Sequence, residues 1–243
     1  MNSHYAEPRS LPEPAHSPAP VAALLVAAGR GLRAGRGAPK QYRLVDGHPV
    51  LARALAPFLA EPAISRVVVV IGEGDDVLYA DAVAGIDDIR LAAPTPGGTT
   101  RQDSVRRGLR ALARDGFDGI VLVHDAARPF VSLALIGAAI GKLGDVGMAA
   151  IPALPVTDTV KQVEEGYVGA TIDRDGLVVV TSPIVLPAEV VAALDGLASY
   201  DFATLAGELA ARFPVVTIEA PPEGRRVGSL DDVRLLEALT RPA

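Results

Sequence analysis

The stretch LLVAAGRGLRAGRGAPKQY, residues 24–42, joins an apolar run to a loop crowded with glycines and cations. The run has the composition of a strand that is buried on both faces of a sheet. The glycines let a ligand approach the backbone closely, and Arg30, Arg33, Arg36 and Lys40 supply positive charge. Because such loops bind phosphates in α/β proteins, we expect a highly anionic ligand here, such as a triphosphate. A solvated basic turn is the alternative.

Further apolar runs alternate with segments that have helical spacing. The runs cover residues 21–28, 66–72, 119–125 and 147–155, and the helical segments cover residues 48–60 and 103–115. The alternation predicts a mostly parallel sheet wrapped by helices, in which ligands lie outside the carboxyl ends of the strands. Later elements are expected as helices at 187–197 and 202–212, a strand at 213–220 and a last helix from Ser229.

Two segments depart from this alternation. Residues 1–20 carry five prolines and no apolar block, so we expect a disordered tail that is neither a signal peptide nor a membrane anchor. Residues 156–183 place β-branched segments on both sides of a polar turn, which predicts a hairpin-like β-arm. The remaining chain, 21–243, is expected to form a single domain.

Composition excludes several classes of function. The 243 residues carry a net charge of −6, which argues against a general nucleic-acid or membrane-surface binder. The chain has no cysteine, which excludes thiol catalysis and fits the cytoplasm. The four histidines are scattered, and His124 is expected to be buried at a strand end. The opening loop lacks the Walker A pattern and makes a poor dinucleotide fingerprint.

Other loops that follow or precede the predicted elements carry candidate site residues. In HDAARP (124–129), Asp125 is placed to bind a metal or a ribose hydroxyl, or merely to cap a turn. PGGTTRQDSV (96–105) is either a base- or ribose-contacting loop or a turn capped by Asp103. DTVK (158–161) and TIDRDGL (171–177) put Thr159, Lys161 and Arg174 on the arm, where charges are usually solvated. EGRRVGSLDD (223–232) combines Arg225 and Arg226 with a capping box.

Five of these motifs together resemble the 2-C-methyl-D-erythritol 4-phosphate cytidylyltransferase family of the non-mevalonate isoprenoid pathway. The motifs are AAGRGLRAGRGAPKQY, GGTTRQDSVRRGL, VLVHDAARPFV, PVTDTVK and TIDRDGL, in that order. The resemblance runs from about Val21 to Leu239 and omits the tail. It implies a Rossmann-like nucleotidyltransferase fold, CTP as substrate, Mg²⁺ as cofactor and a homodimer whose β-arms embrace.

The resemblance also implies roles for individual residues. Arg33 and Lys40 fall on the family's catalytic pair. Nucleotide-binding positions are Ala27, Ala28, Gly29, Gly31, Gly98, Arg101, Ser104 and Asp125, with Asp125 also a metal-contacting acid. Substrate-binding positions are Thr159, Arg174, Ser182 and Arg226, with Arg174 reaching in from the partner subunit.

Three departures from the family pattern fall in the second half of the chain. Ser182 and Ile184 stand where the family has the threonine and the glutamine of T-P-Q. Tyr200 replaces a threonine beside Asp201, and Arg226 and Gly228 replace the lysine and the threonine of a later segment. The first hypothesis is therefore transfer of CMP from CTP to 2-C-methyl-D-erythritol 4-phosphate. The alternatives are transfer to another polyol phosphate, such as ribitol 5-phosphate, and a non-catalytic nucleotide-binding paralogue.

Overall fold

The computed structural model describes residues 19–29, 38–146, 148–194 and 214–221, together with Arg226 and Asp232. Its elements are β1 (Val21–Ala27), the 3₁₀ turn η1 (Lys40–Tyr42), β2 (Leu44–Val45), β3 (His48–Pro49), α1 (Val50–Ala60), β4 (Ile64–Ile71), α2 (Asp76–Ala82), β5 (Thr95–Pro96), α3 (Arg101–Arg114), β6 (Ile120–Asp125), α4 (Leu133–Val146), β7 (Ala149–Pro155), β8 (Val160–Glu164), β9 (Tyr167–Ile172), β10 (Val178–Val180), β11 (Ile184–Leu186), α5 (Ala188–Leu194) and β12 (Val215–Glu219). The helices expected at 202–212 and from Ser229, and most of the tail, lie outside the described residues.

The central sheet confirms the α/β prediction. Its strand order is β10-β7-β11-β6-β1-β4-β5, and β12 also pairs with β7. Strand β1 is parallel to both neighbours, with β4 on one side and β6 on the other, whereas β10 and β11 run antiparallel to their partners. The chain thus leaves β1 toward β4 and later returns to the other side at β6. This reversal leaves a ligand site at the carboxyl ends of β1 and β6.

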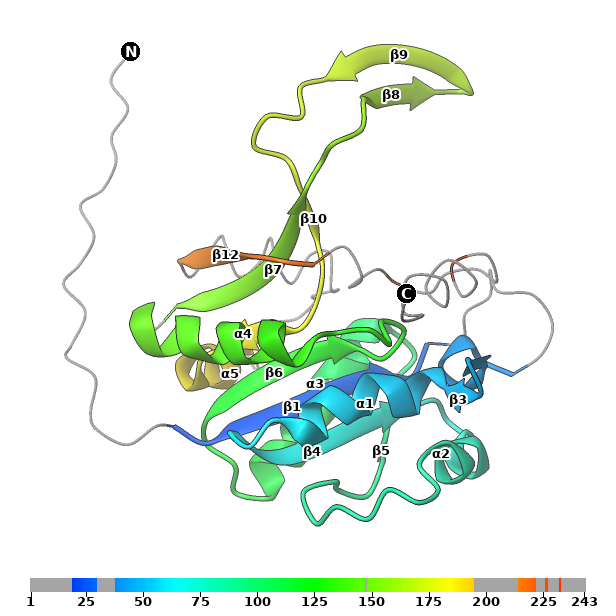
Figure 1. The fold of residues 1–243 in the computed structure, drawn as a ribbon, viewed down its shortest axis with the longest axis vertical. Coiled ribbons are helices and arrows are strands. Elements are labelled where there is room, and N and C mark those ends of the chain that lie inside the picture. Colours follow the sequence, from blue (N-terminus) through cyan, green and yellow to red (C-terminus); the bar gives the residue numbers. More distant parts are fainter. Residues whose placement is uncertain are drawn as a thin grey trace, which may run out of the picture.

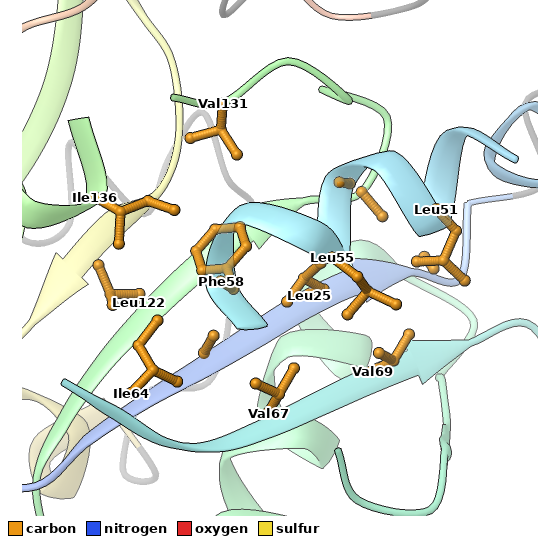
Figure 2. Packing of buried hydrophobic residues seen from close by; sticks show 14 of the residues in the cluster. Leu25, Leu51, Leu55, Phe58, Ile64, Val67, Val69, Leu122, Val131 and Ile136 are labelled. Atoms are coloured by element: carbon orange, nitrogen blue, oxygen red, sulfur yellow. The ribbon is translucent and has the colours of Figure 1, made fainter. Parts of the chain in front are cut away.

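Alternating side chains divide the interior into two cores, one on each face of the sheet. Helices α1 and α4 cover one face, and α3 and α5 lie behind the other (Figure 1). On the first face, Phe58, Leu55 and Leu51 of α1 lie over β1 and β4 (Figure 2). Phe58 is fully buried, and burial of such a side chain contributes roughly 1.5–3 kcal/mol.

Helix α3 begins at a different cap from the one predicted. Thr100 is its N-cap, and its side chain accepts a hydrogen bond from the Asp103 amide at 3.0 Å. The Thr100 hydroxyl in turn donates to the Asp103 carboxylate at 2.7 Å. Asp103 therefore lies in the first turn, where its negative charge interacts favourably with the helix dipole.

The predicted hairpin is confirmed. Strands β8 and β9 are antiparallel, and both residues of their two-residue turn, Glu165 and Gly166, have positive φ, as a type I′ turn requires. The hairpin stands away from the sheet (Figure 1). The last part of the predicted arm, β10, instead rejoins the sheet beside β7. No helix among the described residues is long and apolar enough to cross a membrane.

Gly108 marks the closest approach of α3 to the sheet and gives a first prediction. A Cβ at Gly108 would lie 2.3 Å from Leu24 Cδ1 and 2.8 Å from Val70 Cγ2. Gly108→Ala is therefore expected to lower the free energy of unfolding by about 1–3 kcal/mol. Gly141→Ala in α4 is the matched control, because a Cβ there meets no atom within 4 Å. It should raise stability by about 0.5–1 kcal/mol through helix propensity. Equal effects of the two substitutions in urea denaturation would contradict this account.

Candidate active site

Asp125, the last residue of β6, is the centre of the described site. The residue is only 6% exposed. Its Oδ1 accepts a hydrogen bond from the Ala127 amide at 3.1 Å, so Asp125 does cap the following turn. Its Oδ2 lies 2.8 Å from Arg226 Nε and 3.1 Å from Arg101 Nη2. Two cations from distant parts of the chain thus meet on one carboxylate oxygen.

Charge keeps this buried carboxylate ionised. Burial alone would raise the pKa of Asp125, because a low-dielectric environment disfavours the anion. Arg101, Arg226 and Lys40 outweigh burial and hold the pKa well below its usual range. Asp125 is therefore a fixed negative charge in a group of positive ones.

Lys40 is placed beside this group by η1, which follows the glycine-rich loop. The neighbouring Gln41 donates a side-chain hydrogen bond to the Ala27 carbonyl and so ties η1 to the end of β1. Burial lowers the pKa of Lys40 to about 8, while the Asp125 charge opposes the shift and Arg226 adds to it. The ammonium group is consequently only partly hydrated and available to an incoming anion.

The β5–α3 loop lies against the end of β1. A Cβ at Gly97 would lie 2.5 Å from the Ala28 Cβ, so glycine permits this close approach. The Gly98 amide donates to Ser104 Oγ at 3.1 Å, and Ser104 Oγ donates to the Thr100 carbonyl at 2.9 Å. Ser104 is 1% exposed, so its hydroxyl holds the loop in shape.

Some predicted site residues meet in the structure and others do not. Lys40, Arg101, Asp125 and Arg226 form one group of charges, and Gln41, next to Lys40, binds the Ala27 carbonyl at the end of β1. Ala28 lies against Gly97 of the β5–α3 loop, and Gly29 follows it. Thr159 and Arg174 are exposed and flank the β8–β9 hairpin on the arm. Arg33 and Gly31, like Arg30 and Arg36, lie outside the described residues.

The first departure from the family pattern, at Ser182 and Ile184, lies in the protein interior. Ile184 is fully buried in the core beneath α3 and pairs with Val123 across β11 and β6. Ser182 is 2% exposed, and its Oγ accepts from the Asp125 amide at 3.2 Å and lies 2.9 Å from His124 Nδ1. Replacement of the family's glutamine by Ile184 therefore adds an apolar core contact.

Sequence reasoning missed Arg128, although HDAARP contains it. Burial lowers the pKa of Arg128, and Asp125 opposes that shift. Arg128 also contributes to the lowered pKa of Lys40, so it belongs to the same group of charges. The signal was its place three residues after the strand-terminal aspartate. We call Lys40, Arg101, Arg128 and Arg226 around Asp125 the cation cluster.

The donor set limits the kind of metal site. Within the described ranges, no group of three or more His, Asp or Glu side chains is arranged to hold a metal ion. Asp125 supplies a carboxylate at the end of β6. Such a set fits Mg²⁺ that is carried mainly by phosphate oxygens and water, rather than an ion held in a protein cage.

Comparisons with known proteins agree with this geometry. The family model for 2-C-methyl-D-erythritol 4-phosphate cytidylyltransferase matches residues 21–207. The bifunctional enzyme IspD/IspF of Rhodopseudomonas palustris (strain HaA2) is 50% identical over 186 residues, which are 74% of this chain and 45% of that protein. The chain thus spans about half the length of the curated relatives it matches.

Solved structures give the same result. 4-Diphosphocytidyl-2C-methyl-D-erythritol synthase from Anaerococcus prevotii superposes with a TM-score of 0.75 at 26% identity, over 93% of this chain and 100% of that one. 2-C-Methyl-D-erythritol 4-phosphate cytidylyltransferase from Thermus thermophilus has a TM-score of 0.67 at 29% identity, over 90% and 98% of the two chains.

The sheet, the strand-order reversal and the charged loops at its carboxyl edge define the Rossmann-like α/β fold that nucleotidyltransferases have. With the family model covering more than half of its residues, the chain belongs to the 2-C-methyl-D-erythritol 4-phosphate cytidylyltransferase family.

The burial of Lys40 leads to a stability prediction. The pKa of Lys40 is lower in the folded protein than its ordinary value of 10.5. The folded protein therefore binds the ammonium proton less tightly than the unfolded chain does. Stability rises with pH between about 8 and 10.5, and below pH 8 the folded state bears the full penalty. Lys40→Met should therefore raise the free energy of unfolding at pH 7 by about 2 kcal/mol.

The matched control is Lys142→Met, which removes an exposed lysine from α4 and should change stability by less than about 0.5 kcal/mol. Guanidinium denaturation at pH 7 measures both. If Lys40→Met destabilised the protein, Lys40 would be a structural residue.

Proposed function

We propose that this chain transfers CMP from CTP to 2-C-methyl-D-erythritol 4-phosphate, releases pyrophosphate and so serves isoprenoid precursor synthesis. The observation that carries the proposal is the cation cluster, which gathers four positive side chains around one carboxylate at the carboxyl edge of the sheet. Three net positive charges remain after Asp125 is balanced, which favours a polyphosphate ligand over a neutral one.

The proposed reaction requires the protein to position the two substrates and to supply positive charge, but it does not require a general base. A phosphate monoester is largely dianionic near neutral pH, because its second pKa is about 6. One of its oxygens attacks the α-phosphorus of CTP, the new O–P bond forms, and the bond to the β-phosphate oxygen breaks as pyrophosphate leaves. Lys40 stabilises the negative charge that accumulates in this step, with Arg33 as its predicted partner.

The nucleotide half of the proposal uses the loops at the end of β1 and before α3. Gly29 and Gly98 present backbone where a ligand comes near, and Arg101 bridges this loop to Asp125. We assign Ser104 to the shape of the loop, because its hydroxyl lies between Gly98 and Thr100. Ala27, Ala28 and Gly31 complete the predicted nucleotide contacts.

Asp125 is the residue that would hold Mg²⁺. When bound, Mg²⁺ neutralises phosphate charge and polarises the α-phosphate toward attack. Asp125 also orients the Arg101 and Arg226 guanidinium groups through its Oδ2. Arg101 and Arg226, which contact the same carboxylate, would bind the phosphates of the substrates.

The acceptor half rests on Arg226, Thr159 and Arg174. Arg226 retains the positive charge of the lysine that the family pattern has at this position, although its hydrogen-bond geometry differs. Thr159 and Arg174 are exposed on the arm and fit the role of contacts made in the site of a partner subunit. The burial of Ile184 places this departure in the core and leaves the cation cluster intact.

The arm supports the homodimer that the family resemblance implies. Its register pairs Val163 with Val168 on one face of the hairpin and Val160 with Ile172 on the other, because Val160 and Val163 are three residues apart on β8. Val163, Val168 and Tyr167 are 62%, 71% and 80% exposed, which is unusual for such side chains unless a partner covers them.

The lack of cysteine fits a reducing compartment, and we expect the reaction to take place in the cytoplasm.

A pyrophosphate-release assay tests the proposed reaction. With CTP, Mg²⁺ and 2-C-methyl-D-erythritol 4-phosphate, we expect turnover at least about tenfold above that with ribitol 5-phosphate. Lys40→Met should lose roughly 10²-fold or more in kcat while remaining folded, and Lys142→Met should retain activity. Turnover with ribitol 5-phosphate alone would overturn the acceptor. Failure of CTP and Mg²⁺ to raise the melting temperature would support a protein that does not bind nucleotide.

Val168→Asp tests the role of the arm. A charge in the exposed Val163–Val168 pair should shift a dimer toward monomer in sedimentation equilibrium and lower turnover in parallel, since Arg174 would no longer reach the partner's site. Ile89→Asp is the control, because Ile89 is 95% exposed and lies outside the arm. A monomeric wild-type protein with full activity would contradict the arm's role.

A further inference from the structure

His124 is a buried titratable residue that the proposed reaction does not use. It is fully buried in β6, directly before Asp125, and its ring lies 5.0 Å from the Phe58 ring. Both ring nitrogens nevertheless have polar partners. Nε2 lies 3.0 Å from the Arg128 carbonyl oxygen, and Nδ1 lies 2.9 Å from Ser182 Oγ.

These partners determine the protonation state of the ring. A carbonyl oxygen only accepts, so Nε2 carries the proton that is donated to Arg128. The Ser182 oxygen lies within hydrogen-bond distance of both the Asp125 amide and Nδ1. The amide donates to that oxygen, so the Ser182 proton is directed at Nδ1, which acts as the acceptor.

Ser182 links His124 to Asp125 through hydrogen bonds. Its proton is directed at His124, which leaves the Ser182 oxygen free to accept from the Asp125 amide at 3.2 Å. The antiparallel register of β11 and β6 begins at the pair Ile184 and Val123, and Ser182 lies two residues before Ile184, outside the strand. The hydrogen bond from the Asp125 amide fixes the serine beside the end of β6.

The turn from Asp125 to Arg128 is therefore clamped at both ends. The Asp125 amide is bound by Ser182, the Arg128 carbonyl is bound by His124, and the Arg128 amide donates to the Asp125 carbonyl at 2.9 Å. This turn carries two members of the charged site, Asp125 and Arg128. A small rotation of it would move the carboxylate away from Arg101 and Arg226.

We propose that His124 and Ser182 are positioning residues, a hydrogen-bonded histidine–serine pair that fixes the turn presenting Asp125 and Arg128 to the phosphates. The inference rests on the proposed function for the identity of the phosphates. It also changes the role predicted for Ser182, from a substrate contact to a residue that acts through Asp125.

Kinetics test the pair through a hydroxyl deletion with a matched control. Ser182→Ala should lower kcat at least about tenfold with a smaller change in the KM for CTP, because misplacing the turn weakens contacts made in the reaction step. Thr181→Val removes the adjacent buried hydroxyl, which lies 3.3 Å from the Pro152 carbonyl oxygen, and should change kcat less than about threefold. Equal effects of the two substitutions on kcat would overturn the proposal.

A spectroscopic test is independent of turnover. Nitrogen-15 NMR of the histidine rings at pH 7 should show His124 with its proton on Nε2 and no proton on Nδ1. A proton on Nδ1 would overturn the proposal even if the enzyme is active. If the tautomer is as expected but CTP and Mg²⁺ give no pyrophosphate with any polyol phosphate, the proposed function fails and the clamp stands.

Discussion

The buried carboxylate of Asp125 is the interaction on which the rest of the site depends. Lys40, Arg101, Arg128 and Arg226 would repel one another strongly if they were brought together without a counter-charge. Asp125 provides that charge, and Arg101 and Arg226 contact the same oxygen. The carboxylate thus allows a surplus of positive charge to persist at the sheet edge, where it is ready for an anion.

The fold explains why these residues meet although they lie far apart in the sequence. Lys40 follows β1, Arg101 begins α3, Asp125 ends β6 and Arg226 follows β12. Parallel strands bring their carboxyl ends to one edge, and the reversal of strand order at β1 separates the loops enough to admit a ligand between them. The antiparallel strand β11 then supports Asp125 from beside β6 and carries Ser182 into the space behind it.

The parts of the structure with strong local signals could be predicted from the sequence. The apolar runs became β1, β4, β6 and β7, and the polar turn near Gly166 became the tip of a hairpin. Elements that form only through tertiary pairing were not predicted from the sequence. Strand β5 is two residues long, and β10 and β11 are short strands stabilised by their pairing with β7 and β6. In the site, the motifs located Asp125 and Lys40. The motifs could not show that the hydroxyl groups of Ser104 and Ser182 already hydrogen-bond to other protein groups, because these contacts depend on how distant elements pack.

The account claims that Asp125 holds the cation cluster together and that Lys40 is partly dehydrated within it. Carbon-13 NMR of the Lys40 side chain tests this directly, in the wild-type protein and in Asp125→Asn. We expect the wild-type pKa near 8 and a lower value in Asp125→Asn, where the remaining guanidinium groups are no longer balanced. A pKa near 10.5 in both proteins would contradict the account, because Lys40 would then be an ordinary solvated lysine.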